Sequence, residues 1–266
     1  MLNIIGIGLR GLESITLGSA DLIRSSDEVY LDTYTSILPD GTLDEISRFF
    51  NREIIAAGRE FIEGESPIIE SSRNLTVSLL VPGDGMSATT HKVLEKTCIS
   101  MGISVNVLEN ASILNVIPGR LGLYTYKMGP PVSLPFITDK FFPASVFNKI
   151  RRNHSNAMHT IVLLDLKSGR NIEISQAIKW LLEMETTAGG EKFLDNEEVC
   201  VVSRVSQAGE KILCGKIKAL ESIDFQSPAA IVILSNPDTF EMENIDFFRI
   251  ASEDGHQAWN KAGANR

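Results

Sequence analysis

Cysteine is scarce in this chain of 266 residues, and the three that occur, Cys98, Cys200 and Cys214, are widely spaced. They form no CxxC pair and no Cys/His set with the spacing of a zinc site. The sequence therefore gives no signal for a metal site or for a disulfide framework. We expect three small, buried, unpaired thiols in a reducing compartment.

Basic residues are outnumbered, because 25 Lys and Arg stand against 34 Asp and Glu, a net charge of -9. A general nucleic-acid-binding protein needs clustered cations to neutralise phosphates. The one dense basic segment, residues 149–152, is more simply explained as a helix end. No apolar run approaches the roughly 18 residues of a membrane-spanning helix, and Met1 to Gly6 lacks the cationic start of a signal peptide. We expect a soluble cytoplasmic protein without membrane or general nucleic-acid binding.

Motifs of several large enzyme classes are missing too, since the chain has no GxSxG, HExxH, Walker A or EF-hand sequence. Chemistry that needs neither a metal nor an enzyme nucleophile is therefore favoured. No catalytic residue is predicted.

In the first half of the chain, short apolar segments alternate with amphipathic ones. Strands are expected at residues 2–7, 28–31, 53–55, 75–81 and 105–108. Helices are expected over residues 16–24, 43–50, 61–74 and 88–101, the last with Ser87 as a candidate N-cap. This alternation predicts an open parallel sheet with flanking helices, whose ligands lie beyond the carboxyl ends of the strands.

The second half has more strands than long helices. Strands are expected at residues 132–136, 160–165, 198–202, 211–214 and 230–234, with helices over 145–156 and 172–184. This excess of strands over helices predicts a mixed sheet with hairpins and helices. Pro118 and Gly119 interrupt the pattern, so we place a boundary near residues 112–120. The predicted α/β domains are 1–112 and 113–252, followed by a frayed tail over 253–266.

Two glycine-rich turns follow strands. Gly6, Gly8 and Gly11 satisfy the GxGxxG spacing of a dinucleotide site, with Asp32 slightly past the second strand. A nicotinamide site is thus one interpretation, and glycines serving only a tight strand exit are the favoured one. In the second turn, residues 82–85, Asp84 could hold a ligand's ammonium or hydroxyls or could only bond nearby backbone N–H groups.

Three further polar positions have two interpretations each. Residues 110–113 leave the fifth strand with small polar groups that could hold an adenosine edge or could form an ordinary loop. His159 precedes a strand, where a lone histidine is more often structural than catalytic. Asp165 ends that strand and could contact a ligand or cap the next segment.

Taken together, these segments resemble the diphthine synthase branch of the tetrapyrrole methylase superfamily over residues 1–248. The stretches that carry the resemblance are Gly6-Ile7-Gly8-Leu9, residues 27–36, Pro82-Gly83-Asp84, Ala88-Thr89-Thr90-His91, residues 110–113, Phe142-Pro143 and residues 159–165. The Tyr34-Thr35-Ser36 and Ala88–His91 stretches are specific to the branch.

The resemblance implies a homodimer of two-domain subunits that binds S-adenosylmethionine between domains and releases S-adenosylhomocysteine. Its substrate would be translation elongation factor 2, methylated on the amino group of a 3-amino-3-carboxypropyl-histidine. Methyl transfer from a sulfonium fits the missing motifs, because the protein has chiefly to align two partners. The implied cofactor contacts are Leu9, Asp84, Ser87, Ser112, Ile113, Leu164, Val205 and Ala230.

Three departures from the family pattern lie among these segments. Gly85 stands where the family usually has proline, Ala230 where a histidine is usual, and Val205 belongs to an Arg-Val-Ser-Gln segment in place of Arg-Ala-Gly-Ser. Two alternatives stay open: a methylase of the same fold acting on a corrinoid precursor or ribosomal RNA, and an inactive cofactor-binding dimer.

Overall fold

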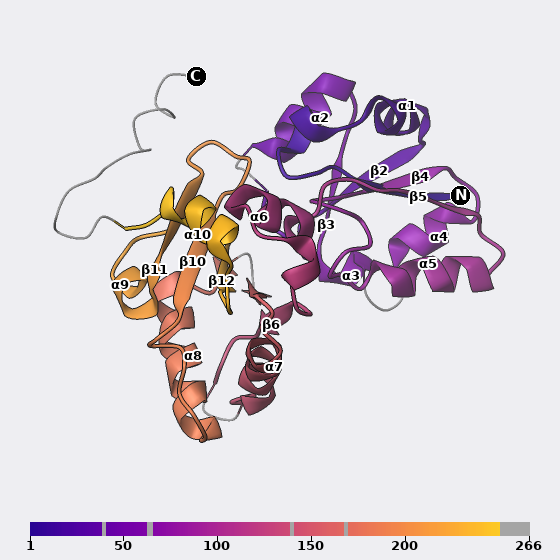
Figure 1. The fold of residues 1–266 in the computed structure, drawn as a ribbon. Coiled ribbons are helices and arrows are strands. Elements are labelled where there is room, and N and C mark those ends of the chain that lie inside the picture. Colours follow the sequence, from indigo (N-terminus) through magenta and orange to yellow (C-terminus); the bar gives the residue numbers. More distant parts are fainter. Residues whose placement is uncertain (39–40, 63–65, 139–140, 168–169, 251–266) are drawn as a thin grey trace. The chain divides into compact units, whose positions relative to one another are not determined.

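A computed structural model of the chain describes residues 1–38, 41–62, 66–138, 141–167 and 170–250 (Figure 1). The chain divides into two compact units, Met1–Ile113 and Leu114–Arg266. The predicted frayed tail lies outside the described residues. Within the described part of the chain, no helix is both long and apolar enough to cross a membrane.

The first unit is built on a five-stranded parallel sheet with the strand order β3-β2-β4-β1-β5. Its strands are β1 (Leu2–Gly6), β2 (Glu28–Asp32), β3 (Ile55–Ala57), β4 (Val77–Val81) and β5 (Val105–Leu108). The central strands β1 and β4 are buried at every position, which explains their continuous apolar sequence. In register, Gly6 of β1 lies beside Val81 of β4, so the loops after these two strands start side by side.

Helices cover both faces of this sheet, as Figure 1 shows. The helical elements are η1 (Gly11–Ser14), α1 (Leu17–Ser25), α2 (Thr42–Phe50), α3 (Arg59–Ile62), α4 (Pro67–Ser72) and α5 (His91–Ser100). Neighbouring strand residues point to opposite faces. Ile5 and Leu80 therefore pack in one core with Ile23 of α1, while Ile4 packs in a second core with Leu94 of α5. The predicted open parallel sheet with flanking helices is confirmed.

The second unit contains a mixed sheet with the strand order β11-β10-β12-β7-β6. Its strands are β6 (Val132–Leu134), β7 (Thr160–Leu164), β10 (Glu198–Ser203), β11 (Lys211–Lys216) and β12 (Ala229–Ile233), with a small hairpin of β8 (Leu166–Lys167) and β9 (Arg170–Asn171). Among these described strands, β6 and β7 pair in parallel, whereas β7, β12, β10 and β11 pair antiparallel in that order. The predicted mixed sheet is confirmed.

One face of the mixed sheet is covered by helices α7 (Ala144–Ser155), α8 (Ile174–Ala188) and α9 (Ile217–Glu221), which share a core with the strands. Helix α6 (Ile113–Leu121) starts at the end of the first unit, and a short 3-10 turn, η2, spans Thr125–Lys127. The final helix, α10 (Thr239–Asp246), begins with a capping box in which Asp238 and Glu241 bond each other's backbone N–H groups.

Several predicted boundaries were wrong for local reasons. Helix α5 starts at His91 rather than Ala88, because Ala88 has a positive φ of 54° and cannot belong to a right-handed helix. Ser87 does not cap the helix, since its hydroxyl donates to Asp84. Pro118 and Gly119 do not interrupt the helical segment but lie inside α6, although an interior proline removes one helical hydrogen bond.

The prediction of three free thiols was wrong for two of the cysteines. Cys200 of β10 and Cys214 of β11 lie opposite each other in the antiparallel register and form a disulfide. Cys98 is free and buried, as expected. The pairing was invisible in the sequence because it depends on the register of the β10–β11 hairpin rather than on a CxxC spacing.

Candidate functional site

The loops after β1 and β4 are joined at the carboxyl edge of the first sheet. The backbone N–H of Gly8 donates to the carbonyl oxygen of Gly83 at 3.0 Å, and the N–H of Gly83 donates back to Gly8 at 2.8 Å. A β-carbon on Gly6 would lie 2.8 Å from the Gly83 carbonyl oxygen and 3.0 Å from Cβ of Asn110. Glycine is therefore required where these loops approach each other, which confirms the tight-strand-exit interpretation.

The nicotinamide interpretation finds no support in this geometry. Gly11 opens the short 3-10 turn η1 rather than a long helix whose N-terminus could face a pyrophosphate. Asp32 is fully buried, and its carboxylate lies 3.1 Å from Nε2 of His91. It is therefore not placed to bind a ribose hydroxyl.

Asp84 connects the loop after β4 with the loop after β5. Its Oδ1 accepts hydrogen bonds from the hydroxyl of Ser87 at 2.8 Å and the N–H of Met86 at 3.0 Å, and its Oδ2 accepts from the N–H of Asn110 at 3.2 Å. Burial raises the pKa of this carboxyl, but the hydrogen bonds from Ser87, Asn110 and Met86 outweigh it and hold the pKa below its ordinary value. The group is a charged carboxylate whose two oxygens hold its own and a neighbouring loop.

Asn110 was predicted only as part of the 110–113 segment, without a role of its own. Its Nδ2 donates to the carbonyl oxygens of Gly6 and Ser14, both at 2.9 Å, and its Oδ1 accepts from the N–H of Ala111 at 2.8 Å. One side chain thus holds the exits of β1 and β5 together. The sequence signal was an amide two residues after the end of a strand.

The other residues predicted in the first unit lie at the same edge. A β-carbon on Gly83 would sit 3.9 Å from Cδ2 of Leu9 and 3.8 Å from the carbonyl oxygen of Ala111. Ser112 is buried and Ile113 is the first residue of α6. The structure thus brings Leu9, Asp84, Ser87, Ser112 and Ile113 together around the exits of β1, β4 and β5.

In the second unit, the three predicted residues share one edge of the mixed sheet. Leu164 ends β7, Val205 lies just past the end of β10, and Ala230 lies at the start of β12. Because β12 runs antiparallel to both neighbours, its start lies beside their ends, and Ala230 pairs with Leu163 and Val202. Val205 and Ala230 are buried, at 4% and 3% exposure.

The Arg204–Gln207 segment, one of the departures from the family pattern, is held by its own contacts. Arg204 and Ser206 have positive φ angles of 50° and 64°. The N–H of Arg204 donates to the carbonyl oxygen of Pro228, and the N–H of Ser206 donates to Glu210. Neighbouring residues therefore fix this turn in a left-handed conformation that is unusual for residues other than glycine.

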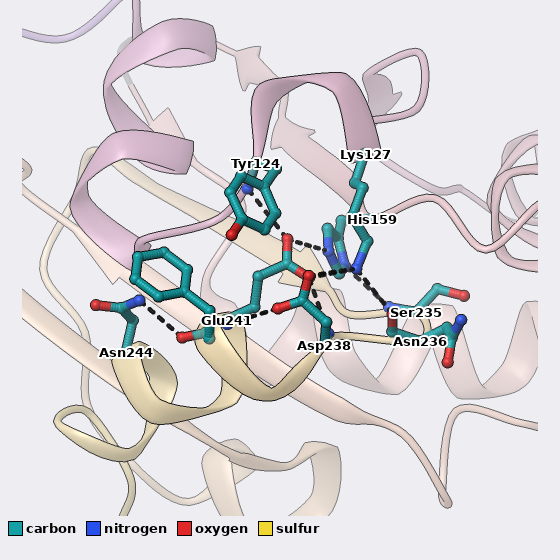
Figure 2. A network of polar contacts seen from close by, with 9 residues as sticks. Tyr124, Lys127, His159, Ser235, Asn236, Asp238, Glu241 and Asn244 are labelled. Carbon is teal, nitrogen blue, oxygen red and sulfur yellow. Dashed lines mark hydrogen bonds and ion pairs between the residues drawn. The ribbon is translucent and has the colours of Figure 1, made fainter.

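His159 is structural, as predicted. It is fully buried, and the N–H of Ser235 donates to its Nδ1 at 3.0 Å, so the ring proton must sit on Nε2, 3.2 Å from Glu241 (Figure 2). Burial holds the pKa of His159 below its ordinary value, against the opposing effect of Glu241. Asp165 is exposed and accepts a hydrogen bond from the N–H of Leu166, which supports its role as a local cap.

Comparisons with known proteins agree on one family. The family model described as "Tetrapyrrole (Corrin/Porphyrin) Methylases" matches residues 1–221. The chain is 45% identical to a diphthine synthase of Thermoplasma acidophilum, over 93% of this chain and 95% of that protein. It is 34% identical to the human diphthine methyl ester synthase, over 94% and 95% of the two chains. A crystal structure of a diphthine synthase superposes with a TM-score of 0.83 at 27% identity, covering 93% and 95%. The chain belongs to the tetrapyrrole methylase family and, within it, to the diphthine synthases.

Proposed function

We propose that this protein is an S-adenosylmethionine-dependent diphthine synthase. It would methylate the amino group of the 3-amino-3-carboxypropyl-histidine of elongation factor 2, in the cytoplasm and as a homodimer. The observation that carries the proposal is the meeting of the loops around Leu9, Asp84 and Ser112 at the carboxyl edge of the parallel sheet, where such sheets bind ligands. The family membership and the names of its relatives support the choice of reaction.

The loop after β4 in the first unit offers an adenosine-bearing cofactor a close approach to the backbone at Gly83. Gly83 has no side chain, and the position of its missing β-carbon lies in van der Waals contact with Leu9 and the Ala111 carbonyl. A ligand can therefore approach the backbone closely there. We propose Leu9, Asp84, Ser87, Ser112 and Ile113 as cofactor-site residues of this unit. In the second unit, we propose Leu164, Val205 and Ala230.

When bound, S-adenosylmethionine supplies an electrophilic methyl group. The protein then has to align the acceptor and keep its amine unprotonated. An alkyl ammonium has an ordinary pKa near that of lysine, about 10, and only the free amine can attack. A partly desolvated site lowers that pKa and favours the free base.

A Gly83→Ala variant should bind S-adenosylhomocysteine at least about tenfold more weakly. Its methyl group would fill the space between Leu9 and Ala111, and alanine is strained by roughly 1–2 kcal/mol at the φ of 77° that Gly83 adopts. Gly102→Ala is the matched control, because Gly102 has a φ of 74° and open space around its β-carbon position. Calorimetric titration should show weaker binding only for Gly83→Ala. Equal affinities in the two folded variants would remove Gly83 from the proposed site.

The function is tested by incubating the protein with radiolabelled S-adenosylmethionine and elongation factor 2 that carries the precursor histidine. Label should pass to the factor, and the intact mass should rise by whole methyl groups. The name of the human relative, diphthine methyl ester synthase, favours a second candidate product, a methyl ester. Mild base removes an ester methyl and leaves amine methyls in place. No transfer, while S-adenosylhomocysteine binds, would contradict the proposed substrate and leave an inactive binding protein as the explanation.

A further inference from the structure

Two family-specific stretches, Tyr34-Thr35-Ser36 and Ala88–His91, have no part in the proposed cofactor site, yet a buried pair joins them. Asp32 ends β2 and His91 begins α5. Oδ2 of Asp32 lies 3.1 Å from Nε2 of His91, and both side chains are fully buried. The two stretches are therefore parts of one array.

Asp32 holds the loop after β2. Its Oδ1 accepts hydrogen bonds from the N–H of Tyr34 at 2.7 Å and of Thr35 at 3.1 Å, and its Oδ2 accepts from the Thr35 hydroxyl. Burial raises the pKa of the Asp32 carboxyl, but His91, Thr35 and the Tyr34 backbone outweigh it and lower the pKa. The loop is therefore organised around a carboxylate whose charged form is favoured.

His91 connects this carboxylate to the exit of β4. Its Nδ1 lies 2.7 Å from the hydroxyl of Thr89 and 3.1 Å from the carbonyl oxygen of Gly85. Because β2 and β4 are neighbours in the sheet, the imidazole spans two adjacent strand exits. It fixes the loop after β2 against the loop that carries Asp84.

The loop after β2 has the chemistry that an amino-acid-like acceptor requires. Tyr34 and Ser36 carry hydroxyl groups and are partly exposed, whereas the Thr35 hydroxyl donates to Asp32. The guanidinium of Arg59, an exposed residue of α3, lies 5.5 Å from the centre of the Tyr34 ring. A cation beside neutral donors suits a carboxylate next to an amine.

We propose that the Thr33–Ser36 loop and Arg59 bind the carboxylate-bearing end of the methyl acceptor, and that Asp32 and His91 are the positioning residues that hold this loop. The inference rests on the proposed function and assigns the acceptor to the exit of β2. The loop after β4, which carries Asp84, is also held by contacts that do not involve His91. These are the Gly8–Gly83 backbone pair and the hydrogen bonds of Asp84. Loss of His91 should therefore disturb acceptor binding more than cofactor binding.

The experiment compares four variants by steady-state methylation of elongation factor 2 and by calorimetry with S-adenosylhomocysteine. His91→Leu should raise KM for the factor at least about tenfold and change the cofactor Kd by less than about threefold. His91→Gln, whose amide can donate a hydrogen bond to the Asp32 carboxylate, should recover most of the wild-type KM. Arg59→Gln, at an exposed position, should raise KM at least about tenfold without lowering the melting temperature.

His159→Gln is the matched control, because His159 is equally buried and lies 3.2 Å from a carboxylate of the second unit. It should lower stability and leave KM unchanged. An equal loss of cofactor affinity in His91→Leu, or an unchanged KM in Arg59→Gln, would overturn the inference. If His91→Leu does not fold, the Arg59→Gln result decides.

Failure of the proposed function can be recognised separately, because the wild-type protein would then bind S-adenosylhomocysteine without methylating the factor. In that case, amide hydrogen exchange tests whether His91 positions the loop after β2. The N–H groups of Tyr34 and Thr35, which donate to Asp32, should exchange at least about tenfold faster in His91→Leu. Unchanged exchange at both amides would contradict the role of His91.

Discussion

An Asp84→Ala variant should lose affinity for S-adenosylhomocysteine by about 10–100-fold. The carboxylate accepts three hydrogen bonds, from Ser87, Met86 and Asn110, and a hydrogen bond to a charged group contributes roughly 1.5–3 kcal/mol. Without it, the exits of β4 and β5 lose their direct link, and a tenfold change in affinity needs only about 1.4 kcal/mol of misalignment. Calorimetric titration of the folded variant measures the loss.

Asp27→Ala is a suitable control for this prediction. The Asp27 carboxylate accepts a backbone hydrogen bond from Thr76 at 2.8 Å, next to the start of β4 rather than its end. Its removal should cost some stability and leave cofactor affinity unchanged. Wild-type affinity in Asp84→Ala would show that the loops hold their places without the carboxylate, and Asp84 would then lose its proposed role.

The sequence predicted the sheets well because burial leaves a strong local signal. Strand β4 is apolar at almost every position because helices cover both faces of the parallel sheet. Strand β3 is short and lies at the sheet edge; it was predicted two residues too early, since three residues carry little periodicity. The start of α5 was missed because nothing in the side chain of Ala88 indicates a left-handed backbone.

The candidate site was predictable where the required residue type is unusual. The sequence alone shows the glycines at the exits of β1 and β4 and the carboxylate beside them. The roles of Asn110 and His91 were not, because each depends on loops that meet only after the strands have paired. The Cys200–Cys214 disulfide has the same origin, since a hairpin register brings the two residues together.

A buried carboxylate in the second unit makes the strongest case for a large effect on stability. Glu241 is fully buried and accepts hydrogen bonds from the ammonium of Lys127 and from the N–H of Tyr124, with His159 at 3.2 Å (Figure 2). Burial raises the pKa of Glu241, but Lys127 and the backbone N–H groups of Tyr124 and Asp238 outweigh it and lower the pKa. Its charged form is therefore favoured by folding.

Glu241→Gln should lower the free energy of unfolding by about 3–5 kcal/mol at pH 7, because it removes the buried carboxylate partner of Lys127 and leaves that ammonium only Asp238, at 4.0 Å, as a charged neighbour. A carboxyl group with a lowered folded-state pKa stabilises the fold fully above its unfolded pKa, about 4.3, and loses that contribution as pH falls through the folded value. The difference in unfolding free energy between wild type and variant should therefore stay constant above about pH 5 and shrink at lower pH.

Urea unfolding across this pH range measures the difference. Glu243→Gln, an exposed change in the same helix, is the control and should differ from wild type by almost nothing at any pH. A difference that persists unchanged at low pH would show that packing, rather than the charge of Glu241, holds α10 in place.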